Sequence, residues 1–96
     1  MPYQAKVTAT ASEAGKKLAP EIRAAAKEAM RKLCANPYAG KALREELRGF
    51  WTYRFNRYRI IYTIDVEKKW IIVQAIGHRR DIYERLNELL LGGTAR

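Results

Sequence analysis

The sequence is poor in residues that cross-link a chain or bind a metal ion. Among its 96 residues there is one cysteine, Cys34, and one histidine, His78. A single cysteine excludes a disulfide framework within the chain and fits a reducing compartment. One histidine, one cysteine and scattered acids offer no metal-ligand spacing. We therefore expect neither a metal site nor a cofactor.

Long apolar runs are also missing. No stretch approaches the roughly 20 apolar residues that span a bilayer. The first ten residues, MPYQAKVTAT, have neither the charged start nor the apolar centre of a signal peptide. We expect a cytoplasmic protein with no membrane partner. The length predicts a single domain over residues 1–96, of which 94–96 form a loose tail.

Acidic residues are scarce, and residues 47–64 contain none. Nineteen Lys and Arg stand against ten Asp and Glu, which gives a net charge of +9. This balance favours a polyanion, a membrane surface or an acidic protein as the partner. A solvated basic surface without a specific partner is the alternative.

Local patterns predict an α+β fold. Residues 3–9 alternate as a strand with one buried face. Ser12 is a candidate cap for a short helix, Pro20 suits the first turn of a second helix, and Asn36-Pro37 ends it. The predicted core stripe of the second helix contains Ile22, Ala25, Ala26, Ala29 and Leu33.

The second half of the chain predicts strands and a final helix. A connecting segment with a helical tendency leads to strands from Arg48, at 58–64 and at 70–76, with a tight turn at Asn56-Arg57. Asp81 is a candidate cap for the last helix, which Gly92-Gly93 ends. We expect an antiparallel sheet, made of the N-terminal strand and a three-stranded meander, with an N-terminal helix pair and a C-terminal helix.

Three motifs resemble the signature of RelE toxins in the RelE/ParE superfamily. They are Leu47-Arg48-Gly49, Tyr58-Arg59-Ile60-Ile61-Tyr62, and the stretch Ile76-Gly77-His78-Arg79-Arg80-Asp81-Ile82-Tyr83. The resemblance implies a compact RelE-like fold and the toxin component of a type II toxin–antitoxin system. It also implies a metal-independent endoribonuclease that cleaves messenger RNA in the ribosome, by attack of the 2′-hydroxyl on the phosphate.

The same resemblance implies the catalytic residues. Arg54, Arg59, Arg79 and Tyr83 match the family's basic cluster on one face of the sheet. Arginine binds phosphate with two bonds and stays charged, so it suits the developing phosphorane. Thr52 departs from the pattern, because many relatives carry a basic residue there that is proposed as the general base.

Two further side chains admit two interpretations each. Tyr83 either stacks on a splayed base and assists proton transfer or packs at the edge of the last helix. His78 is a secondary candidate for acid–base catalysis, with a structural role at the end of a strand as the alternative.

Other basic side chains are candidates for contact with messenger or ribosomal RNA. Arg23, Lys27 and Arg31 recur every four residues and form a row, for which a solvated helix face is the alternative. The whole set is Lys16, Lys17, Arg23, Lys27, Arg31, Arg48, Arg57 and Arg80.

The family resemblance also implies partners and leaves two other functions open. The partners are the ribosome with its messenger RNA and an acidic, partly disordered antitoxin that covers Arg59, Arg79 or the helix with Tyr83. One alternative is a ParE-like poison of DNA gyrase, which needs no nuclease site. The other is a non-catalytic RNA-binding protein or a decayed toxin, which would bind RNA without cutting it.

Overall fold

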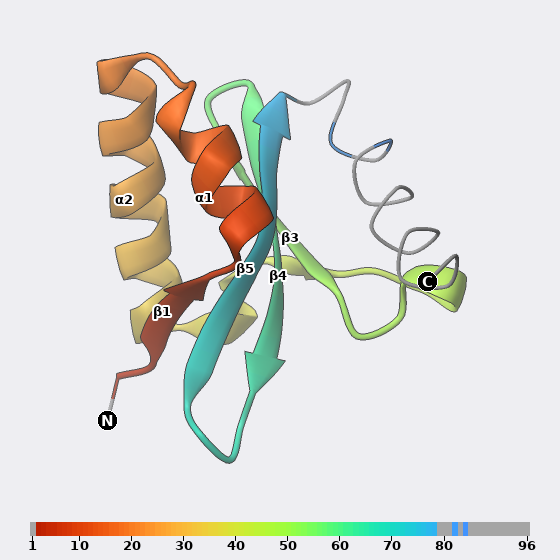
Figure 1. Cartoon of the computed structure of the whole chain (residues 1–96). Helices are drawn as coiled ribbons and strands as arrows, with labels where there is room; N and C mark the ends of the chain where they lie inside the picture. Colours follow the sequence, from red (N-terminus) through yellow and green to blue (C-terminus); the bar gives the residue numbers. More distant parts are fainter. Residues whose placement is uncertain (1, 79–81, 83, 85–96) are drawn as a thin grey trace.

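A computed structural model describes residues 2–78 together with Ile82 and Glu84, and Figure 1 shows the arrangement. The predicted α+β class is confirmed. In chain order the elements are β1 (Gln4–Val7), α1 (Ala9–Lys16), α2 (Pro20–Ala35), the 3₁₀ turn η1 (Pro37–Ala39), β2 (Lys41–Ala42), the 3₁₀ turn η2 (Glu45–Leu47), β3 (Trp51–Phe55), β4 (Tyr58–Asp65) and β5 (Trp70–His78).

The sheet has five strands in the order β1-β5-β4-β3-β2. The predicted meander is present, because β3, β4 and β5 pair antiparallel in sequence. Two details differ from the prediction. The first strand, β1, pairs parallel to β5, and α1, α2 and the strands β2 to β4 lie between these two strands in the chain. The segment after α2 contributes the two-residue strand β2, which pairs with β3.

The helices begin and end close to the predicted signals. The cap of α1 is Thr8 and not Ser12, since the Thr8 side chain accepts a hydrogen bond from the Ala11 N–H at 3.2 Å. Pro20 occupies the first turn of α2, as expected, and Asn36 ends that helix. In the core stripe Ala26, Ala29 and Leu33 are buried, whereas Ile22 and Ala25 are only half-buried.

The first strand does not have the buried face that its alternation predicts. All four residues of β1 are exposed, including Val7 at 43%. The reason is its position at the sheet edge, where one side has no neighbouring strand and alternation is no longer a guide to burial. Ala9, predicted to extend this strand, already belongs to α1.

One face of the sheet packs against α1 and α2, which both lie on the same side in Figure 1. We call it the helix-covered face. Ile60, Tyr62, Ile71, Val73 and Ile76 from the strands pack there. Their helix partners are Ala11, Ala29 and Leu33. Ala11 and Ala29 are small, so the helix backbones can approach the large side chains of the strands closely. This cluster is the main core of the protein.

A buried tyrosine ties the segment after α2 to the sheet. The Tyr62 hydroxyl donates to the Pro37 carbonyl at 2.7 Å and accepts from the Gly40 N–H at 3.2 Å. Burial raises the pKa of Tyr62 to about 12. A Cβ on Gly40 would collide with this hydroxyl and would lie 2.6 Å from the Thr52 carbonyl oxygen. The close approach therefore requires glycine at position 40.

A second, smaller cluster lies on the other face of the sheet. Ile61 and Ala75 from the strands are buried there together with Ile82, which is helical. Leu43, Leu47 and Phe50 pack around them. Of the predicted C-terminal helix, Ile82 and Glu84 are helical, and its other residues, including the cap Asp81, Gly92-Gly93 and the tail 94–96, lie outside the described residues.

Candidate active site

Two arginines face each other across the β3–β4 hairpin. Arg54 of β3 and Arg59 of β4 are partners in the strand register, one pair away from the turn at Asn56-Arg57. Asn56 has a φ of 52°, so it takes the left-handed conformation that asparagine tolerates and closes the predicted turn. Paired residues of neighbouring strands have Cβ atoms roughly 4.5–5.5 Å apart. The hairpin thus brings together two of the predicted site residues.

The alternation of the strands places this pair away from the two long helices. Trp51, Tyr53 and Phe55 pack with the core of the helix-covered face. Thr52 and Arg54 lie between them in sequence, so they belong to the opposite face. The register puts Thr52 opposite Ile61 and Arg54 opposite Arg59. We call this side of the sheet the arginine face.

No described carboxylate neutralises the arginine pair. The ion pairs seen among residues 2–78, Ile82 and Glu84 are Lys16–Glu13 and Arg31–Glu28, both on the helices. Like charges directly opposite each other on a sheet destabilise it. A pair of arginines that costs stability and has no described acid beside it is suited to bind an anion such as a phosphate.

Among the described residues, the two arginines use few of their donors in hydrogen bonds. Arg54 Nε donates to the Asn56 carbonyl at 3.4 Å, which holds its stem along the hairpin. The buried Nε of Arg59 has no hydrogen-bond partner within the described part of the chain. A buried donor without a partner costs roughly 1–3 kcal/mol, so the position of the Arg59 side chain carries a cost in stability.

Thr52 lies on the arginine face, and its burial there does not follow from the sequence pattern. It is only 3% exposed, and its Oγ1 has no hydrogen-bond partner among the described residues. The sequence marked it merely as a departure from the family pattern. The signal that points to it is its two-residue spacing from Arg54, which places both side chains on the same face.

His78 lies on the other side of the sheet from the arginine pair. Its register partner is Tyr58, and the two rings meet edge to face at 5.5 Å between centroids. Arg59 is the next residue along β4 and pairs with Gly77. Consecutive strand side chains point to opposite faces, so His78 is not brought together with Arg59. The other candidates at this end, Arg79, Arg80 and Tyr83, lie outside the described residues.

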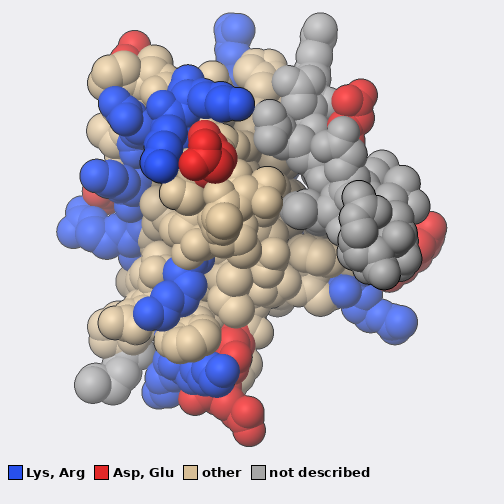
Figure 2. Space-filling view, in the orientation of Figure 1, with Lys and Arg blue, Asp and Glu red and all other residues tan. Residues whose placement is uncertain are grey.

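The other basic residues predicted to contact RNA lie either on or next to the two long helices or in two connecting segments of the sheet. Arg48 follows η2 and Arg57 lies in the β3–β4 turn, both exposed. Figure 2 shows Lys and Arg gathered over the two helices. Those from the predicted set are Lys16, Lys17, Arg23, Lys27 and Arg31. Arg31 Nη2 lies 2.9 Å from Glu28, and this contact lowers the pKa of Glu28.

Three other features were compared with the described residues: a metal site, a membrane-spanning helix and a reactive cysteine. They contain no group of three or more His, Cys, Asp or Glu arranged to hold a metal ion. None of their helices has the length and apolar character needed to cross a membrane. Cys34 is half-buried in α2, and burial raises the pKa of its thiol, which disfavours the reactive thiolate.

The fold and the arginine face define a small basic α+β protein whose sheet carries a cross-strand pair of arginines. Residues 5–83 match the profile of a family described as the ParE toxin of the type II toxin–antitoxin system parDE. The chain is also 41% identical over 87 residues to Toxin RelG of Mycobacterium tuberculosis, covering 88% of this chain and all of that protein. The chain therefore belongs to the RelE/ParE superfamily and is a toxin of a type II toxin–antitoxin system.

Solved structures agree with this assignment. The toxin–antitoxin complex RelBE2 of Mycobacterium tuberculosis contains a chain that matches with a TM-score of 0.78 and 37% identity, over 82% of this chain and 93% of that one. The isolated RelE toxin of E. coli matches with a TM-score of 0.68 and 20% identity, over 79% and 83%. At 20% identity, the match to the E. coli RelE toxin shows that the fold is shared and nothing more.

Proposed function

We propose that this toxin is a ribosome-dependent endoribonuclease that cleaves messenger RNA and thereby inhibits translation in the cytoplasm. The observation that carries the proposal is the register pairing of Arg54 with Arg59, which have no described acid beside them. Relatives named RelG and RelBE2 support the RelE branch at 41% and 37% identity.

The chemistry asks little of the protein beyond positioning and charge. The 2′-hydroxyl gives up its proton to water and attacks the adjacent phosphorus, and the resulting phosphorane gains negative charge. The bond between phosphorus and the 5′-oxygen then breaks, the 5′-oxygen takes up a proton, and a 2′,3′-cyclic phosphate remains. Arg54 and Arg59 would bind the phosphate oxygens and stabilise that charge, a kind of interaction whose loss commonly costs about 10²–10³-fold in rate. Arg79 and Tyr83, matched to the family motif by sequence, complete the proposed catalytic set. His78, the secondary candidate, pairs in register with Tyr58 and with neither arginine of the pair.

No strong base is present among the described side chains of the arginine face. Arginine remains protonated, and Thr52 has no basic group. Holding the reacting atoms in line can supply roughly 7–11 kcal/mol of the barrier. We propose that the ribosome's decoding site supplies this alignment. Contacts with RNA would come from Lys16, Lys17, Arg23, Lys27, Arg31, Arg48, Arg57 and Arg80.

The neutralising partner in this proposal is an acidic, partly disordered antitoxin. The solved relatives include toxin–antitoxin complexes, which supports such a partner. A segment of it that covers Arg59, Arg79 or the helix with Tyr83 would block the arginine face.

The test is primer extension on a defined messenger RNA in programmed ribosomes. Wild type should cut only when ribosomes are present, and Arg59→Ala and Arg79→Ala should abolish the cuts. Arg44→Ala is the matched control, since Arg44 is an exposed arginine outside the proposed site. Intact messenger in every lane would overturn the proposal.

A second candidate function is a ParE-like poison of DNA gyrase. The observation that favours it is the family profile itself, which is described as a ParE toxin. The fold does not separate the two branches, so the same protein is tested for gyrase cleavage complexes on supercoiled DNA. Cleavage complexes together with intact messenger would assign the gyrase branch. Salt-sensitive RNA binding with neither activity would identify a decayed toxin.

A further inference from the structure

Lys41 is an exposed basic residue that lies outside the three family motifs. It is the first residue of the short strand β2, and the strand register pairs it with Thr52 of β3. Partners in an antiparallel register point to the same face of a sheet, with Cβ atoms roughly 4.5–5.5 Å apart. Lys41 therefore lies on the arginine face, beside the uncharged Thr52.

The packing on either side of β2 agrees with this placement. Leu43 packs in the smaller cluster, which lies on the arginine face, and its N–H donates to the Phe50 carbonyl at 2.9 Å. Side chains two residues apart along an extended chain share a face, so Lys41 lies on the same side as Leu43. Ala42 between them pairs with Trp51, which packs with the core of the helix-covered face.

The backbone just before Lys41 is held by the buried Tyr62. The Gly40 N–H donates to the Tyr62 hydroxyl at 3.2 Å, and this hydroxyl donates to the Pro37 carbonyl at 2.7 Å. The start of the Lys41 side chain is thus fixed, whereas its four-carbon stem can turn. A fixed backbone with a flexible stem suits a lysine that contacts the phosphates of a bound chain.

Arg54 is the diagonal neighbour of Lys41 across β2 and β3. It follows Thr52 by two residues, and diagonal neighbours on one face lie roughly 7–8 Å apart, within reach of long side chains. Arg54 in turn pairs with Arg59 of β4. Lys41, Arg54 and Arg59 therefore form a row of three cations across neighbouring strands, which we call the cation row.

The charge of the cation row indicates the kind of ligand. Within residues 2–78, Ile82 and Glu84, the ion pairs lie on the helices, and none involves a member of the row. A small anion between the two arginines would leave Lys41 without a partner. A phosphodiester chain carries a negative charge at every nucleotide, so it can meet the whole row at once.

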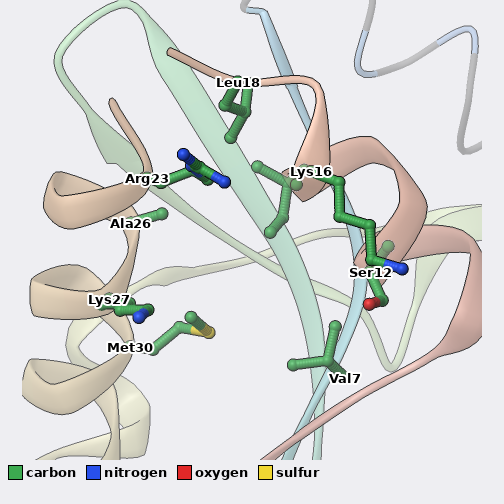
Figure 3. A pocket seen from close by; sticks show the side chains of 11 residues that line it. Val7, Ser12, Lys16, Leu18, Arg23, Ala26, Lys27 and Met30 are labelled. Atoms are coloured by element: carbon green, nitrogen blue, oxygen red, sulfur yellow. The ribbon is translucent and has the colours of Figure 1, made fainter. Parts of the chain in front are cut away.

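Lysines elsewhere in the fold do not lie beside the arginine pair. Figure 3 shows Lys16 and Lys27 at a hollow of about 220 Å³, which is lined by residues of α1, α2 and the sheet. Its lining includes Ile76, which packs with the core of the helix-covered face. Both lysines are therefore on the other side of the sheet from Lys41.

We propose that Lys41 is a further RNA-binding residue of the candidate active site, and that it binds the phosphate next to the one held by Arg54 and Arg59. The inference rests on the proposed function and adds a residue that the family motifs do not contain. The Lys41 ammonium binds a phosphate oxygen as a point charge, whereas the arginines bind with a fork. Because this neighbouring phosphate does not react, Lys41 stabilises the bound RNA equally before and in the transition state.

The first test measures single-turnover cleavage at increasing concentrations of programmed ribosomes. Lys41→Gln should raise the concentration that gives the half-maximal rate about 5-fold or more and leave the maximal rate within about 2-fold, because uniform binding affects KM and not kcat. Lys41→Arg keeps the charge and should stay near wild type. Lys69→Gln, in the turn between β4 and β5, is the control and should match wild type. Arg59→Ala should instead lower the maximal rate.

A second variant moves the lysine to the other face of the same strand. Lys41→Gln combined with Ala42→Lys restores the net charge, but position 42 pairs with Trp51 on the helix-covered face. Ala42 is exposed, so the fold has room for the longer side chain. This double variant should require as much ribosome as Lys41→Gln alone. Recovery to the wild-type value would show that only net charge matters and would overturn the inference.

A third experiment observes Lys41 without ribosomes. Reductive methylation with labelled formaldehyde gives each lysine an NMR signal and keeps its charge, and Lys41→Arg assigns the signal of Lys41. The probe is a trinucleotide RNA with a 2′-deoxy sugar at the cleavage position, which cannot be cut. Its addition should shift the Lys41 signal and leave that of Lys69 in place. An unchanged Lys41 signal would contradict the inference.

The outcomes separate this inference from the proposed function. If wild type and Lys41→Gln cleave messenger with the same half-maximal concentration, Lys41 does not bind RNA and the nuclease proposal stands. If Lys41→Gln lowers only the maximal rate, its role in uniform binding is wrong. If wild type cuts no messenger, the proposed function fails, and the trinucleotide experiment still decides whether Lys41 belongs to an RNA-binding face.

Discussion

Arg54 and Arg59 are paired across the β3–β4 hairpin, and the buried Nε of Arg59 has no hydrogen-bond partner among the described residues. The hairpin thus holds two positive charges together at a cost in stability. Charge repulsion that lowers stability is typical of sites that bind a ligand. A substitution that removes this repulsion should therefore raise stability and lower activity.

Removal of one charge from the arginine pair should stabilise the fold. Arg54→Gln keeps an exposed polar side chain and removes the repulsion, so the free energy of unfolding should rise by about 0.2–1 kcal/mol at low salt. The gain should shrink at high salt because salt screens exposed charges. Messenger cleavage in ribosomes should fall about 10²-fold.

The stability of Arg54→Gln is measured by urea unfolding followed by tryptophan fluorescence, with Arg44→Gln as the control. A loss of stability in Arg54→Gln would contradict the idea that the two arginines repel each other.

Thr52→Val should also increase stability. The substitution keeps the side-chain shape and removes a buried hydroxyl that has no described partner, so the gain should be about 1 kcal/mol. Thr63→Val is the matched control on β4, because the Thr63 hydroxyl accepts a hydrogen bond from Gln74 Nε2 at 3.2 Å. That variant should lose about 1 kcal/mol. Thermal unfolding of the two variants side by side tests the difference in sign, and equal losses would show that the Thr52 hydroxyl is satisfied.

Gly40→Ala should destabilise the protein by about 1–3 kcal/mol. The new methyl group meets the Tyr62 hydroxyl and the Thr52 carbonyl oxygen, and the carbonyl belongs to the backbone and cannot rotate away. Gly15→Ala makes the same chemical change in a helix with open space around it and should stabilise by about 0.5–1 kcal/mol. Urea midpoints of the two variants should therefore move in opposite directions.

Tyr62→Phe should make stability less sensitive to alkaline pH. The folded pKa of Tyr62 is about 12, above its ordinary value of 10, so folding favours the protonated phenol. This contribution is fully present below pH 10 and is lost as the pH rises from 10 to 12. At neutral pH the variant should lose about 1–3 kcal/mol, since the Gly40 N–H loses its acceptor. The difference between wild type and variant should narrow from pH 10 to pH 12 in urea titrations, and a constant difference would rule out Tyr62 as the titrating group.

Sequence patterns were sufficient for the alternation of β3 and for the limits of α2, whereas the start of α1 was predicted at the wrong cap. The alternation of residues 51–55 predicts that Arg54 leaves the core that Tyr53 and Phe55 enter, and the positive φ of Asn56 follows from its side chain. Pro20 and Asn36 mark the limits of α2 through the missing N–H of proline and the local hydrogen bond of asparagine, which accepts from the Tyr38 N–H at 3.3 Å. These are local effects, and a sequence records them directly.

The remaining features depended on residues far apart in the chain. Val7 looks like a core residue until the strand order places β1 at an edge, and Thr52 looks like a mere departure until the register buries it opposite Ile61.

His78 stands beside Arg79 in the sequence, yet it packs against Tyr58 on the other side of the sheet from Arg59. The hollow under Lys16 and Lys27 exists only because α1 and α2 pack side by side on one face. The sequence alone therefore determined the fold class, the family and the set of arginines that we propose to bind phosphate. Only the tertiary structure decided which of these side chains share a face, because strand order and register arise from packing between distant segments and not from local preference.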